Sequence, residues 1–135
     1  MQAATVNPQL DLTNVEASQK ALRVFFRIAI AWGLSNADQI TLLGTTRTRF
    51  LVWKGGGLRT GLDNGTLERL SLIFGIYSAL LALLPIPERA NAWIRKRNSA
   101  PLFGGESALK RMLGGQVSDL YVVRQYLDSQ REGWS

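Results

Sequence analysis

The chain has 135 residues, which is the size of one domain or of two small domains that share a core. It contains no cysteine and no histidine, which excludes disulfides, Cys/His zinc sites, thiol nucleophiles and Ser-His-Asp catalysis. Sixteen lysines and arginines against ten acidic residues give a net charge of +6, which favours a polyanionic or acidic partner.

The first fifteen residues have neither the basic start nor the apolar stretch of a secretory signal, so we expect a cytoplasmic protein. The most apolar segment, residues 70–84, is closed by Pro85 and Pro87. It is shorter than the roughly 20 residues that a bilayer span needs. We therefore expect a buried helix here and no membrane partner.

The first predicted helix covers about residues 15–31. Its apolar residues recur at spacings of three and four, as on one face of an amphipathic helix, and Gly33 ends it. Residues 1–15 are expected to form a flexible N-terminal segment.

Two short helices are predicted next. Ser35 is followed three residues later by Asp38, the pattern of a capping box, and Gly44 ends the helix that they begin. Thr45 or Thr46 can cap the following helix. Together they predict a helix-turn-helix over about residues 35–54, the motif that places a second helix in the major groove of DNA.

The charge of this region agrees with DNA binding. Residues 39–62 carry four cations and no acidic residue, a local charge of +4 that suits phosphate groups. The alternative is a pair of packed helices with a solvated basic face, and the apolar Leu51 and Val52 leave it open. The candidate DNA-binding residues are Thr46, Arg47, Thr48, Arg49 and Lys54.

A long helix begins near Thr66 and is apolar on nearly every side beyond Ser71. Such a helix must be buried all round, and a small chain can cover only part of it, so we expect both a core helix and a homodimer contact. A fully intramolecular core is the alternative. The candidate dimerisation residues are Leu70, Phe74, Tyr77 and Leu81.

The rest of the chain predicts a helix after Pro87, a short helix over about 107–113, and a last helix followed by a free tail with Trp134. One face of the last helix is predicted to carry Val117, Leu120, Tyr121, Arg124 and Leu127. The tail tryptophan suits insertion into a partner, or else it folds back onto its own helix. No segment has a strand pattern, so the predicted fold is all-α.

Enzymatic motifs are not found. The segment GGGLRTG lacks the Lys and Ser/Thr that follow the last glycine of a phosphate-binding loop. Asp119 and Asp128 are predicted to be surface charges, and the run 95–97 a solvated helix end. Because no nucleophile-base pair or metal-ligand cluster can be assembled, we expect no enzyme, no metal and no cofactor.

With these motifs the chain resembles the Xre/MbcA/ParS family of bacterial antitoxins, in particular those paired with RES-domain toxins. The N-terminal likeness lies in LSNADQITLLGTTRTRFLVWKGG. The C-terminal likeness lies in ERANAWIRKRN, LFGGESALKRMLGG and LYVVRQYLDSQREGW, and it is the more specific of the two.

The resemblance implies an Xre/Cro-like helix-turn-helix domain over residues 16–84 and a toxin-binding domain over 85–135. It also implies an antitoxin that occludes the active site of an NAD-degrading RES toxin and represses its own operon by binding operator DNA as a dimer. A stand-alone Xre-type repressor without a toxin is the alternative. The candidate toxin-binding residues are Phe103, Arg124, Tyr126, Asp128, Arg131 and Trp134.

Overall fold

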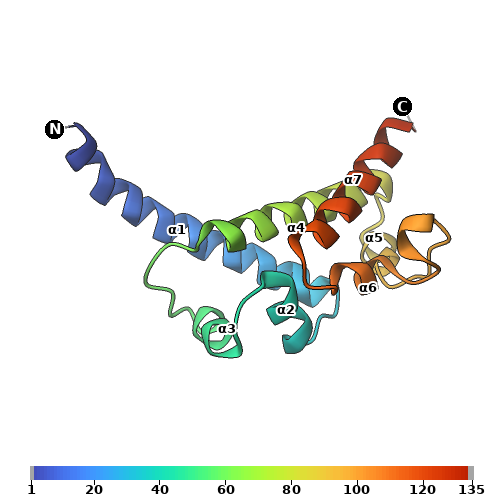
Figure 1. Ribbon diagram of the computed structural model, residues 1–135, viewed down its shortest axis with the longest axis horizontal. Coiled ribbons are helices and arrows are strands. Elements are labelled where there is room, and N and C mark those ends of the chain that lie inside the picture. The colour runs from blue at the N-terminus through green and yellow to red at the C-terminus, as the bar shows by residue number, and fades with distance from the viewer. Residues whose placement is uncertain (1, 134–135) are drawn as a thin grey trace.

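The structure, a computed structural model, describes residues 2–133 and the side chains of residues 14–132 (Figure 1). This part of the chain has no β-strand, only one isolated bridge between Arg97 and Ser107, which confirms the all-α prediction. The elements are α1 (Gln2–Ala31), α2 (Asn36–Leu43), α3 (Arg47–Lys54), α4 (Asn64–Leu83), α5 (Pro87–Trp93), the 3-10 helix η1 (Pro101–Phe103), α6 (Ala108–Met112) and α7 (Val117–Gly133).

Helix α1 is longer than the sequence pattern predicts. It begins at Gln2 rather than near residue 15, so residues 2–14 of the expected flexible segment are helical. The apolar periodicity becomes regular only near Ala21 and therefore marks the buried part of the helix, not its whole length.

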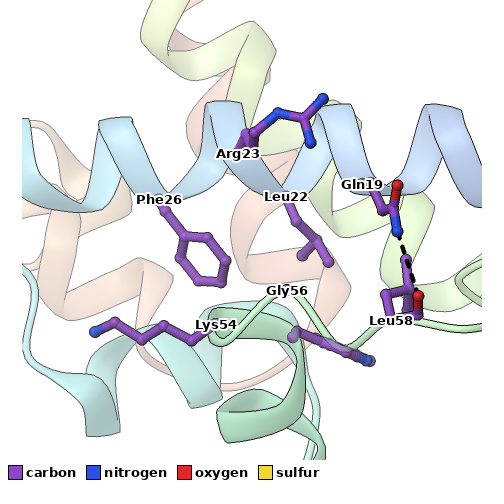
Figure 2. A pocket seen from close by; sticks show the side chains of 8 residues that line it. Gln19, Leu22, Arg23, Phe26, Lys54, Gly56 and Leu58 are labelled. Atoms are coloured by element: carbon purple, nitrogen blue, oxygen red, sulfur yellow. Dashed lines mark hydrogen bonds between the residues drawn. The ribbon is translucent and has the colours of Figure 1, made fainter.

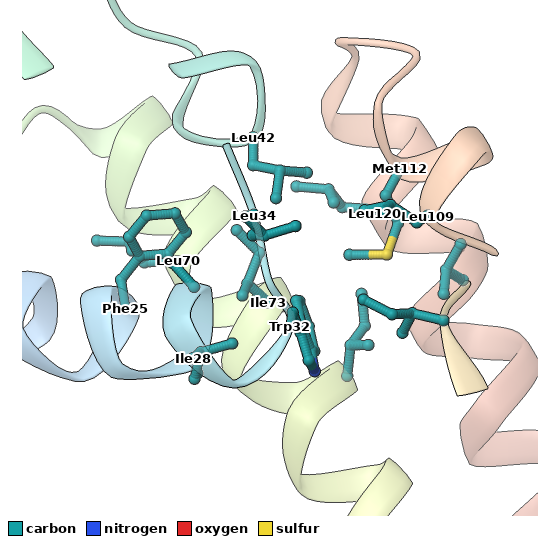
Figure 3. Packing of buried hydrophobic residues seen from close by; sticks show 14 of the residues in the cluster. Phe25, Ile28, Trp32, Leu34, Leu42, Leu70, Ile73, Leu109, Met112 and Leu120 are labelled. Carbon is teal, nitrogen blue, oxygen red and sulfur yellow. The ribbon is translucent and has the colours of Figure 1, made fainter. Parts of the chain in front are cut away.

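Helix α4 is the centre of the fold and packs against α1, α2, α5 and α7. Figure 3 shows Phe25 from α1, Trp32 directly after it, and Leu70 and Ile73 from α4 in one cluster with Met112 of α6. All five side chains are at most 2% exposed. The predicted N-terminal and C-terminal domains therefore share a single hydrophobic core.

The circumference of α4 is buried unevenly. Leu70, Ile73, Ile76 and Leu80 are at most 1% exposed, and Leu67 is 38% exposed. By length and hydropathy alone α4 could cross a membrane, although a core helix of a soluble protein has the same properties. Its packing against four other helices is that of a core helix.

Two arginines join the halves of the chain at helix ends. The Arg95 guanidinium donates to the carbonyls of Trp32 (2.9 Å) and Gly33 (2.7 Å) at the end of α1. The Arg69 guanidinium donates to Gly115 (2.9 Å) and to Thr41 (3.4 Å) near the end of α2. Carbonyls at helix C-termini lack partners within the helix and favour cations, so both contacts are stabilising.

Arg95 therefore corrects the prediction for the basic run 95–97. The sequence places this run at the solvated end of its own helix, whereas Arg95 binds the end of α1. The neighbouring Lys96 and Arg97 are exposed, as predicted.

Candidate functional site

The helices α2 and α3 are joined by a tight turn that local hydrogen bonds define. The Ser35 hydroxyl accepts from the Asp38 amide (3.1 Å) and the Asp38 carboxylate accepts from the Ser35 amide (3.4 Å), which confirms the predicted capping box. Gly44 ends α2 with φ of +64°, a conformation that favours glycine. The Thr46 hydroxyl then accepts from the Arg49 amide (3.2 Å) and begins α3.

The outer face of α3 is cationic. Arg47, Thr48 and Arg49 are exposed, whereas Phe50 on the inner face is fully buried. Neither arginine makes an ion pair or a side-chain hydrogen bond within the described residues. The Lys54 ammonium lies 5.5 Å from the Phe50 ring centroid and donates to the Asn36 side chain (3.0 Å). The face is thus open to an anionic partner.

A second group of cations lies on α1. Lys20, Arg23 and Arg27 are exposed at spacings of three and four, so they follow one side of the helix. Arg23 and Lys54 both line a pocket of about 290 Å³ between α1 and α3 (Figure 2). Cations three or four residues apart repel each other weakly, by about 0.2–0.5 kcal/mol. An anion bound along this side of α1 would remove that cost.

An aromatic cluster lies in the C-terminal half. The Tyr126 ring of α7 stacks on Trp93 of α5 with centroids 6.4 Å apart, and it meets the Phe103 ring edge-on at 5.2 Å. Trp93 and Phe103 also make an edge-on contact at 6.1 Å. Three separate elements are thereby held together at the side of α7.

An ion pair fixes the start of α7. The Arg111 guanidinium donates to the Asp119 carboxylate (2.9 Å) and to the Leu102 carbonyl (3.1 Å). The Asp119 carboxylate also accepts from the Gln116 amide (3.0 Å), and its side chain is only 15% exposed. Asp119 is therefore not the surface charge that the sequence predicts, because its partner is supplied by α6.

Farther along α7, Arg124 lies against α4. Its guanidinium occupies the space beside Gly75, where a Cβ atom would overlap it, and it donates to the Asp128 carboxylate at 3.3 Å. Both side chains are about two-fifths exposed. The pair lies at the edge of the α4–α7 contact and remains accessible to a partner.

An apolar groove of about 140 Å³ lies beside the aromatic cluster. It is formed where the end of α4, α5 and the second half of α7 meet. Its lining residues are Leu80, Leu83, Leu84, Trp93, Tyr126, Leu127 and Gln130.

A family model described as the antitoxin Xre/MbcA/ParS C-terminal toxin-binding domain matches residues 79–133. This span begins near the end of α4 and includes the aromatic cluster, the Arg111–Asp119 pair and the groove. A protein of Sinorhizobium fredii (strain NBRC 101917 / NGR234), the uncharacterized protein y4oB, is 49% identical over 128 residues, which cover 94% of each chain. The chain belongs to the Xre/MbcA/ParS antitoxin family.

The antitoxin therefore carries a toxin-binding domain. Among the side chains of residues 14–132 no group of three or more acidic residues is placed to hold a metal ion.

The structure separates the predicted toxin-binding residues into three groups. Phe103 is only 5% exposed, and its ring packs against the rings of Trp93 and Tyr126. It therefore lies beneath the surface of the antitoxin and is not itself available to a toxin. Tyr126 is half-buried, and Arg124 and Asp128 form an accessible pair. Arg131 is exposed, and Trp134 lies outside the described residues.

The predicted face of α7 also needs correction. Val123 is fully buried with Leu120, and Tyr121 is 53% exposed. The buried side of α7 therefore runs through Leu120, Val123 and Leu127, and Tyr121 lies outside it.

The predicted dimerisation residues of the antitoxin do not share one environment. Leu70 is 1% exposed and packs within its own chain, so it is not available to a second subunit. Tyr77 is half-buried, and its ring contacts the Trp32 ring with centroids 6.1 Å apart. Phe74 and Leu81 are half-buried and follow the exposed Leu67 at steps of seven residues, a spacing that keeps all three on one side of α4.

Sequence reasoning missed the arginines that fasten the antitoxin together and the cations of α1. Arg69 and Arg95 bind carbonyls 46 and 63 residues away along the chain, so no local pattern identifies them. The cations of α1 had a visible signal, because Lys20, Arg23 and Arg27 recur at helical spacing with no acidic residue between them.

Proposed function

We propose that this antitoxin neutralises a RES-domain toxin that degrades NAD, by occluding its active site with the C-terminal half of α7 and the tail that carries Trp134. We propose further that it binds operator DNA through α3, acts as a homodimer, and works in the cytoplasm.

The observation that carries the proposal is the position of α7 within the matched toxin-binding domain. The family match ends at the last described residue of α7, and in Figure 1 this end of the helix projects from the edge of the molecule opposite α2 and α3. Arg131 is exposed there, and Trp134 follows it by three residues. A projecting helix end with an exposed cation, followed in the sequence by an aromatic residue, suits a concave dinucleotide site.

The DNA-binding half rests on the geometry of α2 and α3. A capped helix, a turn at Gly44 and a second helix with exposed Arg47, Thr48 and Arg49 have the layout of a helix-turn-helix. On α1, Arg23 lines the pocket that Lys54 of α3 also lines, and so adds a cation near this surface.

The homodimer rests on the side of α4 that carries Leu67, Phe74 and Leu81. These residues recur every seven positions, as along the seam of two packed helices. A second copy related by a two-fold axis would place the same side of its own α4 against this one.

A stand-alone repressor without a toxin is the second candidate, supported by the same α2–α3 geometry. Co-expression of the antitoxin with the product of the adjacent gene separates the two. The proposal expects that the neighbour alone arrests growth and lowers cellular NAD, and that the antitoxin restores both and co-purifies with it. A harmless neighbour that does not bind the antitoxin would favour the stand-alone repressor.

A further inference from the structure

Two large apolar side chains lie in the middle of the cationic face of α3. Leu51 is 48% exposed and Val52 is 47% exposed, although the helix has a fully buried side that holds Phe50. Leu51 follows Arg47 by four residues and Val52 follows Thr48 by four, so each lies one turn beyond a predicted DNA-binding residue on the same side of the helix.

The chain leaves this pair uncovered. Gly55, Gly56 and Gly57 follow α3, and no atom lies within 4 Å of the place where a Cβ of Gly56 would be. Gly57 lies against Val52, where a Cβ would come within 3.1 Å of the Val52 side chain, and as a glycine it covers less of Val52 than any other residue would. The surface beside Val52 can therefore be approached closely by another molecule.

The charges around the pair indicate what kind of molecule that is. Arg47 and Arg49 precede Leu51 and Val52, Lys54 follows them, and residues 39–62 contain no acidic side chain. An apolar patch flanked in sequence by cations fits a polyanion with apolar groups between its charges. The major groove of DNA is such a surface, because thymine alone among the four bases presents a methyl group there.

We propose that Leu51 and Val52 read thymine methyl groups in the major groove and so select thymine in each operator half-site. This inference rests on the proposed DNA binding through α3. In this arrangement Arg47 and Arg49 contact phosphates or guanine edges, and the apolar pair lies one helical turn farther along the groove.

The test removes the methyl groups and nothing else. A duplex is selected from a random pool by the full-length antitoxin, and the thymines of its half-sites are then replaced by deoxyuridine, which keeps the base pairing. Dissociation constants are compared at one fixed salt concentration. We expect binding to weaken roughly threefold to fivefold for each methyl that the pair covers.

Variants assign the effect to the two residues. The double variant Leu51→Ala, Val52→Ala keeps good helix formers at exposed positions and should bind both duplexes equally while retaining the salt dependence of the wild type. The matched control is Ile30→Ala, which removes an 82% exposed apolar side chain from α1 and should retain the preference for thymine.

The remaining outcomes overturn the inference in distinguishable ways. Wild-type antitoxin that binds both duplexes equally would refute methyl reading while leaving DNA binding intact. Failure to select any duplex would refute the proposed DNA binding, and the inference with it. If the double variant becomes a monomer in light scattering, the pair covers a second copy rather than DNA.

Discussion

The Arg124 guanidinium of α7 occupies the space above Gly75 of α4, where any side chain would have its first carbon. The absence of a side chain at Gly75 lets the two helices pack with a charged group between them. It also directs Arg124 toward Asp128, its ion-pair partner at 3.3 Å. The Arg124 side chain of the predicted toxin-binding face thus contacts the core helix at Gly75.

Replacing Gly75 by alanine should change toxin binding more than stability. Alanine is the better helix former by up to about 1 kcal/mol, and the overlapping group is the end of a flexible side chain, so the free energy of unfolding should stay within about 1 kcal/mol of the wild type. Arg124 is displaced, however, and affinity for the toxin should fall. The effect should vanish in an Arg124→Ala background, as a double-mutant cycle would measure. Equal losses in both backgrounds would contradict the role of Arg124.

Arg69 should be among the residues most important for stability outside the apolar core. Its guanidinium donates to the carbonyls of Thr41, Leu42 and Gly115, and Arg69→Ala removes all three of these hydrogen bonds. Hydrogen bonds from charged donors contribute about 1.5–3 kcal/mol, so we expect a loss of roughly 2 kcal/mol in urea unfolding. Arg89→Ala, at an exposed position, is the control and should cost under about 0.5 kcal/mol. Equal losses for the two variants would refute this role.

Sequence reasoning succeeded where the controlling contacts are local. The capping box of Ser35 and Asp38, the end of α2 at Gly44 and the start of α3 at Thr46 are each defined by residues within five positions. Residue type and spacing were therefore sufficient to predict both helices.

It failed where a partner comes from a distant element. Phe103 and Leu70 are plain apolar residues in sequence, and only packing shows that both are buried rather than offered to a partner. Asp119 reads as a surface carboxylate in the sequence, and its ion-pair partner Arg111, whose guanidinium lies 2.9 Å away, is supplied by α6. The pattern of α4 predicted a surplus of apolar surface but not which side the chain itself covers.

Removing two cations of α3 should weaken operator binding for all sequences. Arg47→Ala, Arg49→Ala deletes two exposed charges that lack ion-pair partners within the described residues. If each contacts a phosphate, the slope of log affinity against log salt should decrease by about two. Lys96→Ala, an exposed cation beyond α5, should leave the slope unchanged. An unchanged slope in the α3 variant would show that α3 does not face DNA.

A charge on the outer side of α4 should separate the proposed dimer. Leu67 is 38% exposed in one chain, so Leu67→Glu should fold, but it would place like charges against each other across a two-fold interface. We expect light scattering to report a monomer at micromolar concentration, with the circular dichroism spectrum of the wild type. The control is Ile30→Glu, which changes an exposed residue of α1, and this variant should remain a dimer. If the Leu67→Glu variant is still a dimer, the interface does not include this side of α4.

The end of α7 should be needed for neutralisation of the toxin but not for folding. Deleting residues 130–135 removes the projecting end of α7 and the tail with Trp134 but keeps Leu120, Val123 and Leu127, the buried residues that hold α7 on α4. The truncated antitoxin should therefore fold, dimerise and bind operator DNA, yet lose protection of cells against the toxin. Growth under co-expression measures this loss, and thermal unfolding of the purified protein measures its stability.

A deletion of equal length at the other terminus, residues 2–7, is the matched control. It removes the first turns of α1, which lie at the opposite end of the molecule in Figure 1, and should leave protection intact. Full protection by the C-terminal truncation would refute occlusion by the tail. Loss of protection together with a large drop in melting temperature would also refute it, because the tail would then act through the stability of α7 rather than by contact with the toxin.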